Sequence, residues 1–387
     1  MKHTPTVKLR NLPQDDPVAT TLAVEPAVYK FGMNQEKSFG DLLEATDRTS
    51  NIIQICHVNQ VTMRSDGTFQ DGLKPTTWAL YQLCRSACPG LYRLLIELTA
   101  DGIEEHRLAA IGIFNQLMRL NFRKLIDGKR MLCDNHSGLI EALLGTGYKT
   151  FSNYRLFEQV QLAMAGLGRP TTMYEGVLNG RWMLVRYYEK GAKLTIPTPE
   201  SAEQFFTGFH FSNHEGGLAS LKGSNIFIRK TEKVSSMLPT KQDRYIRHAG
   251  VKFHTKFQKL LQTVLSYEWD LANCKQGINA LLAQPLGLGL SDPVDEAKRE
   301  TNLSSQIQKR RIPVALANRI IASMMVQGYA DEAPRPLQQL DNATLKKRTG
   351  FDLYVAMSRE AKKCSIAARE ELERTAYLLS VNRFRLR

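Results

Sequence analysis

Two dipeptides that favour tight turns, Asp127-Gly128 and Asn179-Gly180, most restrict the folds open to this chain of 387 residues. Each stands between short segments rich in apolar and β-branched residues, FRKLI and KRMLC in the first case, TMYEGVL and RWMLVRYYE in the second. Such dipeptides favour the type I′ turn of β-hairpins, because glycine adopts a positive φ without steric cost. The pattern predicts two hairpins with positive φ at both glycines, and Asp66-Gly67 indicates a third, shorter one.

Other segments divide clearly into strand-like and helix-like patterns. Aromatic and β-branched residues over 203–213 and 224–230 predict two more strands. Apolar residues three and four apart predict helices over 75–87, 89–98 and 103–120, and a long helical pattern over 253–282. Hairpins joined by helices, without regular strand–helix alternation, predict an α+β fold with a mainly antiparallel, hairpin-rich sheet and packed helices.

Changes in periodicity and in proline and glycine content predict how the chain is organised. Residues 1–45 are weakly periodic and are interpreted as an N-terminal arm, followed by an α+β core domain over 46–284. Prolines and glycines in AQPLGLGLSDPVDEA predict a linker over 285–302. Helical patterns beyond it predict a helical C-terminal region over 303–387.

The charge balance favours a polyanionic partner. The formal net charge is +14 and the isoelectric point about 9.5, and an excess of this size favours nucleic acid over a merely soluble basic surface or an anionic membrane. No apolar run approaches the roughly 18 residues of a membrane helix. The opening residues lack the apolar stretch of a signal peptide, and the six cysteines are scattered, which together favour a cytoplasmic protein with reduced thiols.

The segment KQDRYIRHAGVKFHTKFQK, at 241–259, is the strongest functional indication. Its cations could neutralise phosphates while its rings stack on unpaired bases. A basic hairpin at 123–130 adds further cations. The alternative is an amphipathic helix whose lysines are only solvated. The candidate nucleic-acid-binding residues are Arg123, Lys124, Lys129, Arg130, Lys241, Arg244, Tyr245, Arg247, Lys252 and Lys256.

The stretch HFSNHEGG at 210–217 raises an alternative, a metal-dependent hydrolase or nuclease that uses His210, His214 and Glu215. On a strand, however, the two histidines would lie about 13 Å apart, too far for one metal. The motif HExxH is absent. We therefore expect a strand that ends in a turn, with Asn213 bonded to its own backbone.

Cys56, His57, Cys84 and Cys88 form a second metal candidate, with poor ligand spacing. No phosphate-binding loop or nucleophile elbow is present. The prediction is therefore no metal, no cofactor and no catalytic residue.

Several stretches together resemble the phage/plasmid-like protein domain family. They are FRKLIDGKRMLCDN as a hairpin, GLIEALL as a helix, GRWMLVRYY as a strand, then FFTGFHFSNHEGGLASLKGSNIFIRK and RHAGVKFHTKF. Family members carry an Asn-Ser-(His/Glu)-acid-Gly stretch between two strands, which SNHEGG at 212–217 resembles. The late FDLYVAMSREAK resembles the family's C-terminal helix. The resemblance covers roughly residues 50–265, and IRKTEKVSSML stands where the family has Cys-x-Asn-Gly.

The resemblance implies a phage or plasmid protein that works on DNA in the cytoplasm. The order of hairpins and helices is also similar in plan to single-strand annealing proteins of the Rad52 and phage recombinase type. The sequence therefore predicts a homo-oligomeric protein that binds or anneals single-stranded DNA in recombination or replication, without catalysis. The alternatives are the hydrolase or nuclease above, and an oligomeric scaffold whose charge is incidental.

Overall fold

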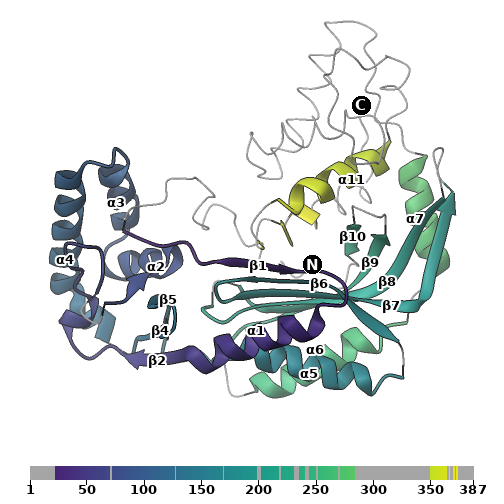
Figure 1. Cartoon of the computed structure of the whole chain (residues 1–387), viewed down its shortest axis with the longest axis horizontal. Helices are drawn as coiled ribbons and strands as arrows, with labels where there is room; N and C mark the ends of the chain where they lie inside the picture. Colours follow the sequence, from purple (N-terminus) through teal and green to yellow (C-terminus); the bar gives the residue numbers. More distant parts are fainter. Residues whose placement is uncertain are drawn as a thin grey trace, which may run out of the picture.

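The computed structural model describes residues 22–69, 72–126, 128–168, 170–197, 202–217, 219–230, 235–239, 244–249, 252–268, 271–283, 349–363, 366, 369–370 and 372–373. These residues form an α+β fold built on two mainly antiparallel sheets (Figure 1). The predicted fold class is therefore confirmed.

The larger sheet has seven strands in the order β1-β6-β7-β8-β9-β10, with β11 also paired to β9. Every pairing within it is antiparallel. The strands are β1 (Val28–Phe31), β6 (Thr171–Asn179), β7 (Trp182–Pro197), β8 (Ala202–His214), β9 (Leu221–Lys230), β10 (Ser235–Pro239) and β11 (Arg244–Ile246).

The smaller sheet has the order β2-β4-β5-β3 and lies within the chain segment that separates β1 from β6. Its strands are β2 (Ser50–Gln54), β3 (Lys74–Pro75), β4 (Arg130–Asp134) and β5 (Leu139–Leu144). Only β3 and β5 run parallel. A 3₁₀ helix, η2 (Val58–Val61), and the helices α2 (Thr77–Ala87), α3 (Leu91–Thr99) and α4 (Glu104–Ile126) complete this part. They share one apolar core, centred on residues such as Leu83, Phe114 and Met118.

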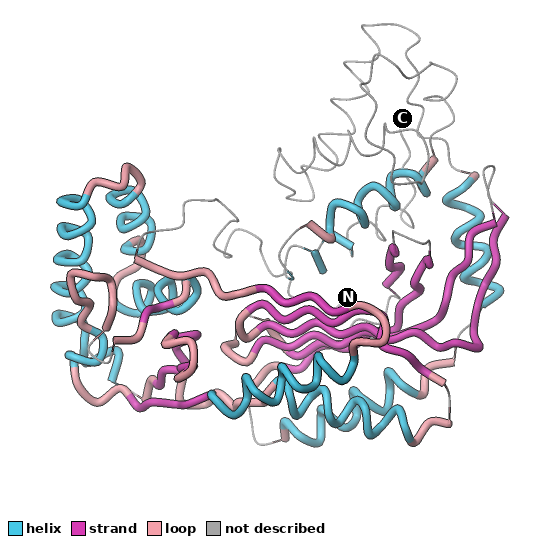
Figure 2. The backbone as a smooth tube through the Cα atoms, viewed as in Figure 1, coloured by secondary structure: helices cyan, strands magenta, loops and turns pink. Residues whose placement is uncertain are grey.

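Three helices cover one face of the larger sheet, α1 (Glu36–Thr49), α5 (Asn153–Ala165) and α6 (Phe253–Leu265) (Figure 2). In α6 the buried residues recur at helical spacing, Phe253, Phe257, Leu260, Leu261 and Val264. Alternate residues of the strands face them, which gives this layer its apolar core.

The opposite face of the larger sheet carries the C-terminal helix α11 (Gly350–Ala361) and the described residues 366, 369–370 and 372–373 (Figure 1). A further helix, α7 (Leu271–Leu282), contacts α11 and β7. Within the described part of the chain, no helix has both the length and the low charge of a bilayer span; α4, the longest at 23 residues, is rich in charged residues.

Gly128 and Gly180 both have positive φ, 69° and 51°, as predicted. Asn179-Gly180 joins β6 to β7 as a hairpin, which confirms that prediction. The hairpin predicted around Gly128 is wrong, since α4 runs as far as Ile126 and only β4 follows the turn. The helix continues through FRKLI because the apolar positions of this segment keep the helical spacing of the residues before them.

Three further sequence predictions need correction. GLIEALL is strand β5, not a helix, and its partner in a hairpin is β4. Gly67 has a positive φ of 81° in a tight turn, but the residues before it form η2 rather than a strand. The long helical pattern over 253–282 divides into α6 and α7.

The predicted boundary at residue 45 does not separate an arm from a core. Strand β1 pairs with β6, and Phe39 and Leu43 of α1 are fully buried against the sheet. Residues 1–21, the predicted linker 285–302 and residues 303–348 lie outside the described residues. Helical structure is present at 350–361 within the predicted helical C-terminal region.

Candidate nucleic-acid interface and a covered polar row

The segment from β11 into α6 presents several side chains of the predicted nucleic-acid site. Tyr245, Arg247, Lys252 and Lys256 are all exposed, and Tyr245 keeps 43% of its surface open to solvent. Phe257, by contrast, is buried in the core. The segment thus combines both sequence interpretations, with a core-facing apolar side and a solvent-facing side that carries cations and one ring.

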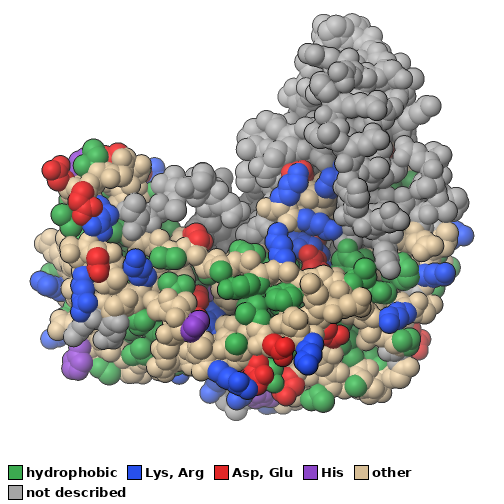
Figure 3. All heavy atoms as spheres, viewed as in Figure 1, with side chains coloured by type: hydrophobic (Ala, Val, Ile, Leu, Met, Phe, Trp, Pro, Cys, Tyr) green, Lys and Arg blue, Asp and Glu red, His purple; other side chains and the backbone are tan. Residues whose placement is uncertain are grey.

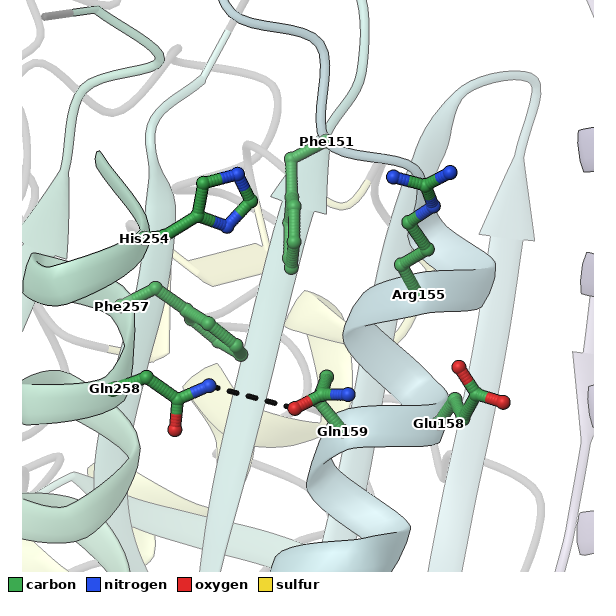
Figure 4. A pocket seen from close by; sticks show the side chains of 7 residues that line it. All are labelled: Phe151, Arg155, Glu158, Gln159, His254, Phe257 and Gln258. Atoms are coloured by element: carbon green, nitrogen blue, oxygen red, sulfur yellow. Dashed lines mark hydrogen bonds between the residues drawn. The ribbon is translucent and has the colours of Figure 1, made fainter. Parts of the chain in front are cut away.

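A groove lies beside this segment, between α5 and α6 (Figure 4). Its volume is about 370 Å³, and its lining residues are Phe151, Arg155, Glu158, Gln159, His254, Phe257 and Gln258. Gln258 donates from Nε2 to Oε1 of Gln159 across the groove, at 3.4 Å. Phe151 and Phe257 supply apolar surface to the groove, and Arg155 and Glu158 bring one cation and one carboxylate to it.

The N-terminal ends of α5 and α6 lie side by side at one end of this groove. The ring of Phe151, which directly precedes the N-cap Ser152 of α5, lies 5.3 Å from the ring of Phe253 and 6.0 Å from that of His254. Lys252, the N-cap of α6, provides no side-chain cap. The first turn of α5 is already capped, since the N–H groups of Asn153 and Arg155 bond to Glu215 and Ser152. The uncapped N-terminus of α6 therefore supplies the partial positive charge that favours anions at this end of the groove.

Exposed cations stand on the three segments that lead to this end. Lys149 is tied to the β11–α6 connection by a backbone hydrogen bond from its N–H to the carbonyl of His248, at 2.9 Å. Arg155 lies on the first turns of α5. We call the exposed set Lys149, Arg155, Arg247, Lys252 and Lys256 the basic rim.

The cations near Gly128 do not join the basic rim directly. Arg123 is exposed near the end of α4, and Lys129 is half-buried before β4. Arg130 donates from Nη2 to the carbonyls of Gly145 and Tyr148, at 3.4 and 3.2 Å, and so supports the loop before α5. The side chains of Lys124 and Arg244, and Lys241 as a whole, lie outside the described residues.

His210 belongs to a row of polar side chains across the larger sheet, on the face opposite α5 and α6. Strand register places Ser224, His210, Arg186 and Glu175 side by side on β9, β8, β7 and β6. Nδ1 of His210 lies 2.9 Å from Oγ of Ser224, and Nη1 of Arg186 donates to Glu175 at 3.1 Å. We call these four residues the polar row.

Arg369, Glu370 and Glu373 cover the polar row. Glu373 accepts a hydrogen bond from Nη2 of Arg186 at 2.6 Å, and Arg369 donates two to Glu175 at 2.8 and 2.6 Å. Glu370 is bound to Lys222, which lies beside the row on β9. Burial opposes ionisation of Glu175, but the guanidinium groups of Arg369 and Arg186 outweigh it and lower the pKa of Glu175 to about 2.

His214 and Glu215 have structural environments. His214 ends β8 and lies between the rings of Trp78 and Trp182, at 6.5 and 5.3 Å, where burial lowers its pKa to about 3. The following turn is confirmed, and its Gly217 has a positive φ of 76°. Glu215 pairs with Arg181 and accepts a hydrogen bond from the backbone N–H of Asn153.

Asn213 does not bond its own backbone as predicted. Its Nδ2 donates instead to the carbonyl of Phe151 at 3.0 Å and to Oδ1 of Asn153 at 2.9 Å. The side chain lies on the α5 face of the sheet, where these acceptors are within reach.

The proposed metal ligands are not brought together. Cys84 is buried in α2, whereas Cys56 is exposed near η2. Among the described residues, no three His, Cys, Asp or Glu side chains are grouped so that they could hold a metal ion.

Comparison with known proteins adds no relative: the sequence matches no protein-family model, no curated protein and no solved structure. Sequence reasoning missed Lys149, Arg155 and the polar row. The row was hidden because its members come from four strands, and only the strand register brings them together.

Proposed function

We propose that this protein binds single-stranded nucleic acid at the basic rim, without catalysis. The observation that carries the proposal is the meeting of the α5 and α6 N-termini beside an open groove, with exposed cations around them. Phosphates would lie against the cations and the N-terminus of α6, which supply charge and N–H donors.

Tyr245 would give the protein its preference for single strands, from the edge strand β11, where it lies opposite Lys222 while Ile246 packs in the core under α5 and α6. Its exposed ring lies on β11, two residues before Arg247. An exposed aromatic ring beside cations can stack on an unpaired base, whereas the bases of a duplex are already stacked on one another. We further propose that several copies of the protein bind along one strand and anneal it to a complementary strand of a mobile genetic element.

Salt dependence of binding tests the proposal. Oligo(dT) affinity should fall with salt with a logarithmic slope of roughly −3, from about four neutralised phosphates at about −0.7 each. The double variant Arg247→Ala/Lys252→Ala should flatten the slope by roughly 1.4, because two phosphate contacts are lost.

The matched control is Arg85→Ala/Arg93→Ala, which removes two cations from α2 and α3 in the smaller-sheet part (Figure 1). Fluorescence anisotropy with labelled oligo(dT), with and without EDTA, measures all three proteins, and circular dichroism checks their folding. Equal slopes for both double variants would refute the basic rim as the binding site. Cleavage of the oligonucleotide that EDTA abolishes would instead support the nuclease alternative.

A further inference from the structure

The polar row is unusual for a buried sheet face. Arg186 and Ser224 are each 1% exposed and His210 is 6% exposed, yet the row is flanked by apolar neighbours such as Leu184 and Ile226. Apolar residues at these positions would cover the sheet at lower cost, because buried charges lose their hydration. A polar row kept at the centre of such a face indicates that the face has a polar ligand.

The charges of the covering residues are complementary to those of the sheet. The sheet presents two cations, Arg186 and Lys222, and one carboxylate, Glu175. The cover presents two carboxylates, Glu370 and Glu373, and one cation, Arg369. Each carboxylate of the cover therefore satisfies one cation of the sheet, as a bound phosphate oxygen would.

A register line next to the polar row reaches β11, because Lys222, two residues before Ser224 on β9, pairs with Ser212 on β8. Tyr245 lies directly opposite Lys222 in the β11–β9 pair, and directly opposed residues share one face of a sheet. Lys222 keeps 35% of its side chain exposed. It therefore lies at the boundary between the covered polar row and the exposed ring of Tyr245. Figure 3 shows Lys and Arg side chains, with some Asp and Glu, gathered where α11 lies over the sheet.

We propose that the polar row with Lys222 is a second phosphate-binding site, and that Arg369, Glu370 and Glu373 occupy it until a polyanion displaces them. The ligand class is the phosphodiester backbone of a single strand that continues from Tyr245 onto the sheet, so the proposal rests on the proposed function. Glu370 and Glu373 then act as internal substitutes for two phosphates. Affinity is reduced by the fraction of molecules that remain covered.

The test is the full-length variant Glu370→Gln/Glu373→Gln, which keeps the shape of the cover and removes its two anions. Its affinity for oligo(dT) should rise by about tenfold or more, because a larger fraction is uncovered. The control Glu97→Gln/Glu105→Gln changes the net charge equally at exposed positions of α3 and α4. An equal gain in the control, or no gain in either variant, overturns the proposal.

Adding Lys222→Gln to the Glu370→Gln/Glu373→Gln variant should reverse most of the gain, because the cation freed by uncovering is then absent. Retention of the full gain would overturn the assignment of Lys222 to the site. Tripolyphosphate as a competitor distinguishes a free polyphosphate from a strand. If tripolyphosphate binds the Glu370→Gln/Glu373→Gln variant more tightly than the parent while oligo(dT) does not, the strand is not the ligand of the row.

Hydrogen exchange of the parent protein keeps the test independent of any variant's folding. Oligo(dT) should speed amide exchange in peptides that cover α11 and residues 366–373. If exchange there is unchanged while the basic rim still binds with the predicted salt slope, the covered site is refuted and the proposed function stands. If oligo(dT) binds neither surface, both fail.

Discussion

The guanidinium of Arg181 and the carboxylate of Glu215 meet inside the protein, with Nη1 and Oε2 3.4 Å apart and side chains only 1% and 7% exposed. Arg181 follows the β6–β7 turn, and Glu215 follows the end of β8. Arg181 also donates to the carbonyl of Thr46 in α1, and Glu215 accepts from the N–H of Asn153 in α5. This pair therefore ties the hairpin, the end of β8 and two helices together.

Breaking this pair should destabilise the fold strongly. Arg181→Met or Glu215→Gln alone should lower the free energy of unfolding by about 3–5 kcal/mol, because the remaining charge is left buried and unpaired. The double variant should lose clearly less than the sum of the two. Urea denaturation of the parent and three variants, analysed as a double-mutant cycle, measures the coupling. Additive losses would show that the two residues contribute separately.

Glu141 should make stability depend on pH near neutrality. Burial raises its pKa to about 7, against an ordinary value of 4.5, although Arg181 opposes this. The folded chain thus keeps a proton that the unfolded chain releases, so this residue's contribution falls as pH rises from 4.5 to 7. Glu141→Gln should recover up to about 3 kcal/mol above pH 7. The variant-minus-parent difference, from urea melts at several pH values, should grow across that window and then level off.

Substitutions of Tyr245 distinguish the contribution of base stacking to binding from that of charge. Tyr245→Ala should weaken oligo(dT) binding by about 1–3 kcal/mol and leave the salt slope unchanged, because a ring that stacks on a base releases no counterion. Tyr245→Phe is the matched control and should bind nearly as the parent does. Anisotropy titrations at four salt concentrations measure both quantities, and an unchanged affinity for the Ala variant would exclude the ring from the site.

Gly208 on β8 lies close against the backbone of β7. A Cβ at this position would lie 2.1 Å from the carbonyl oxygen of Tyr187, which is backbone and cannot rotate away. Gly208→Ala should lower the free energy of unfolding by about 3 kcal/mol or more, because the strands must separate or bend. Thermal melts of both variants and the parent measure the effect. The control Gly112→Ala in α4, where nothing lies within 4 Å, should be neutral or slightly stabilising.

Local patterns predicted most elements but not their partners. The Asn179-Gly180 turn and the helices α2 and α3 followed from neighbouring residues alone. The segment at 122–126 is part of helix α4, where Phe122 packs against the apolar core of the smaller-sheet part, and a turn dipeptide cannot report such packing. The polar row depended on the register of four strands, so a sequence read one segment at a time could not connect Glu175 with Ser224.

The position of β1 has a consequence for synthesis of the chain on the ribosome. Its only strand partner among the described residues, β6, begins roughly 140 residues later, which at about 5–20 residues per second is a delay of about 7–28 s. During that interval the smaller sheet and its helices, whose contacts are nearer in sequence, can already form. The larger sheet therefore closes late, and translation rate between β1 and β6 controls how long β1 stays available to other chains.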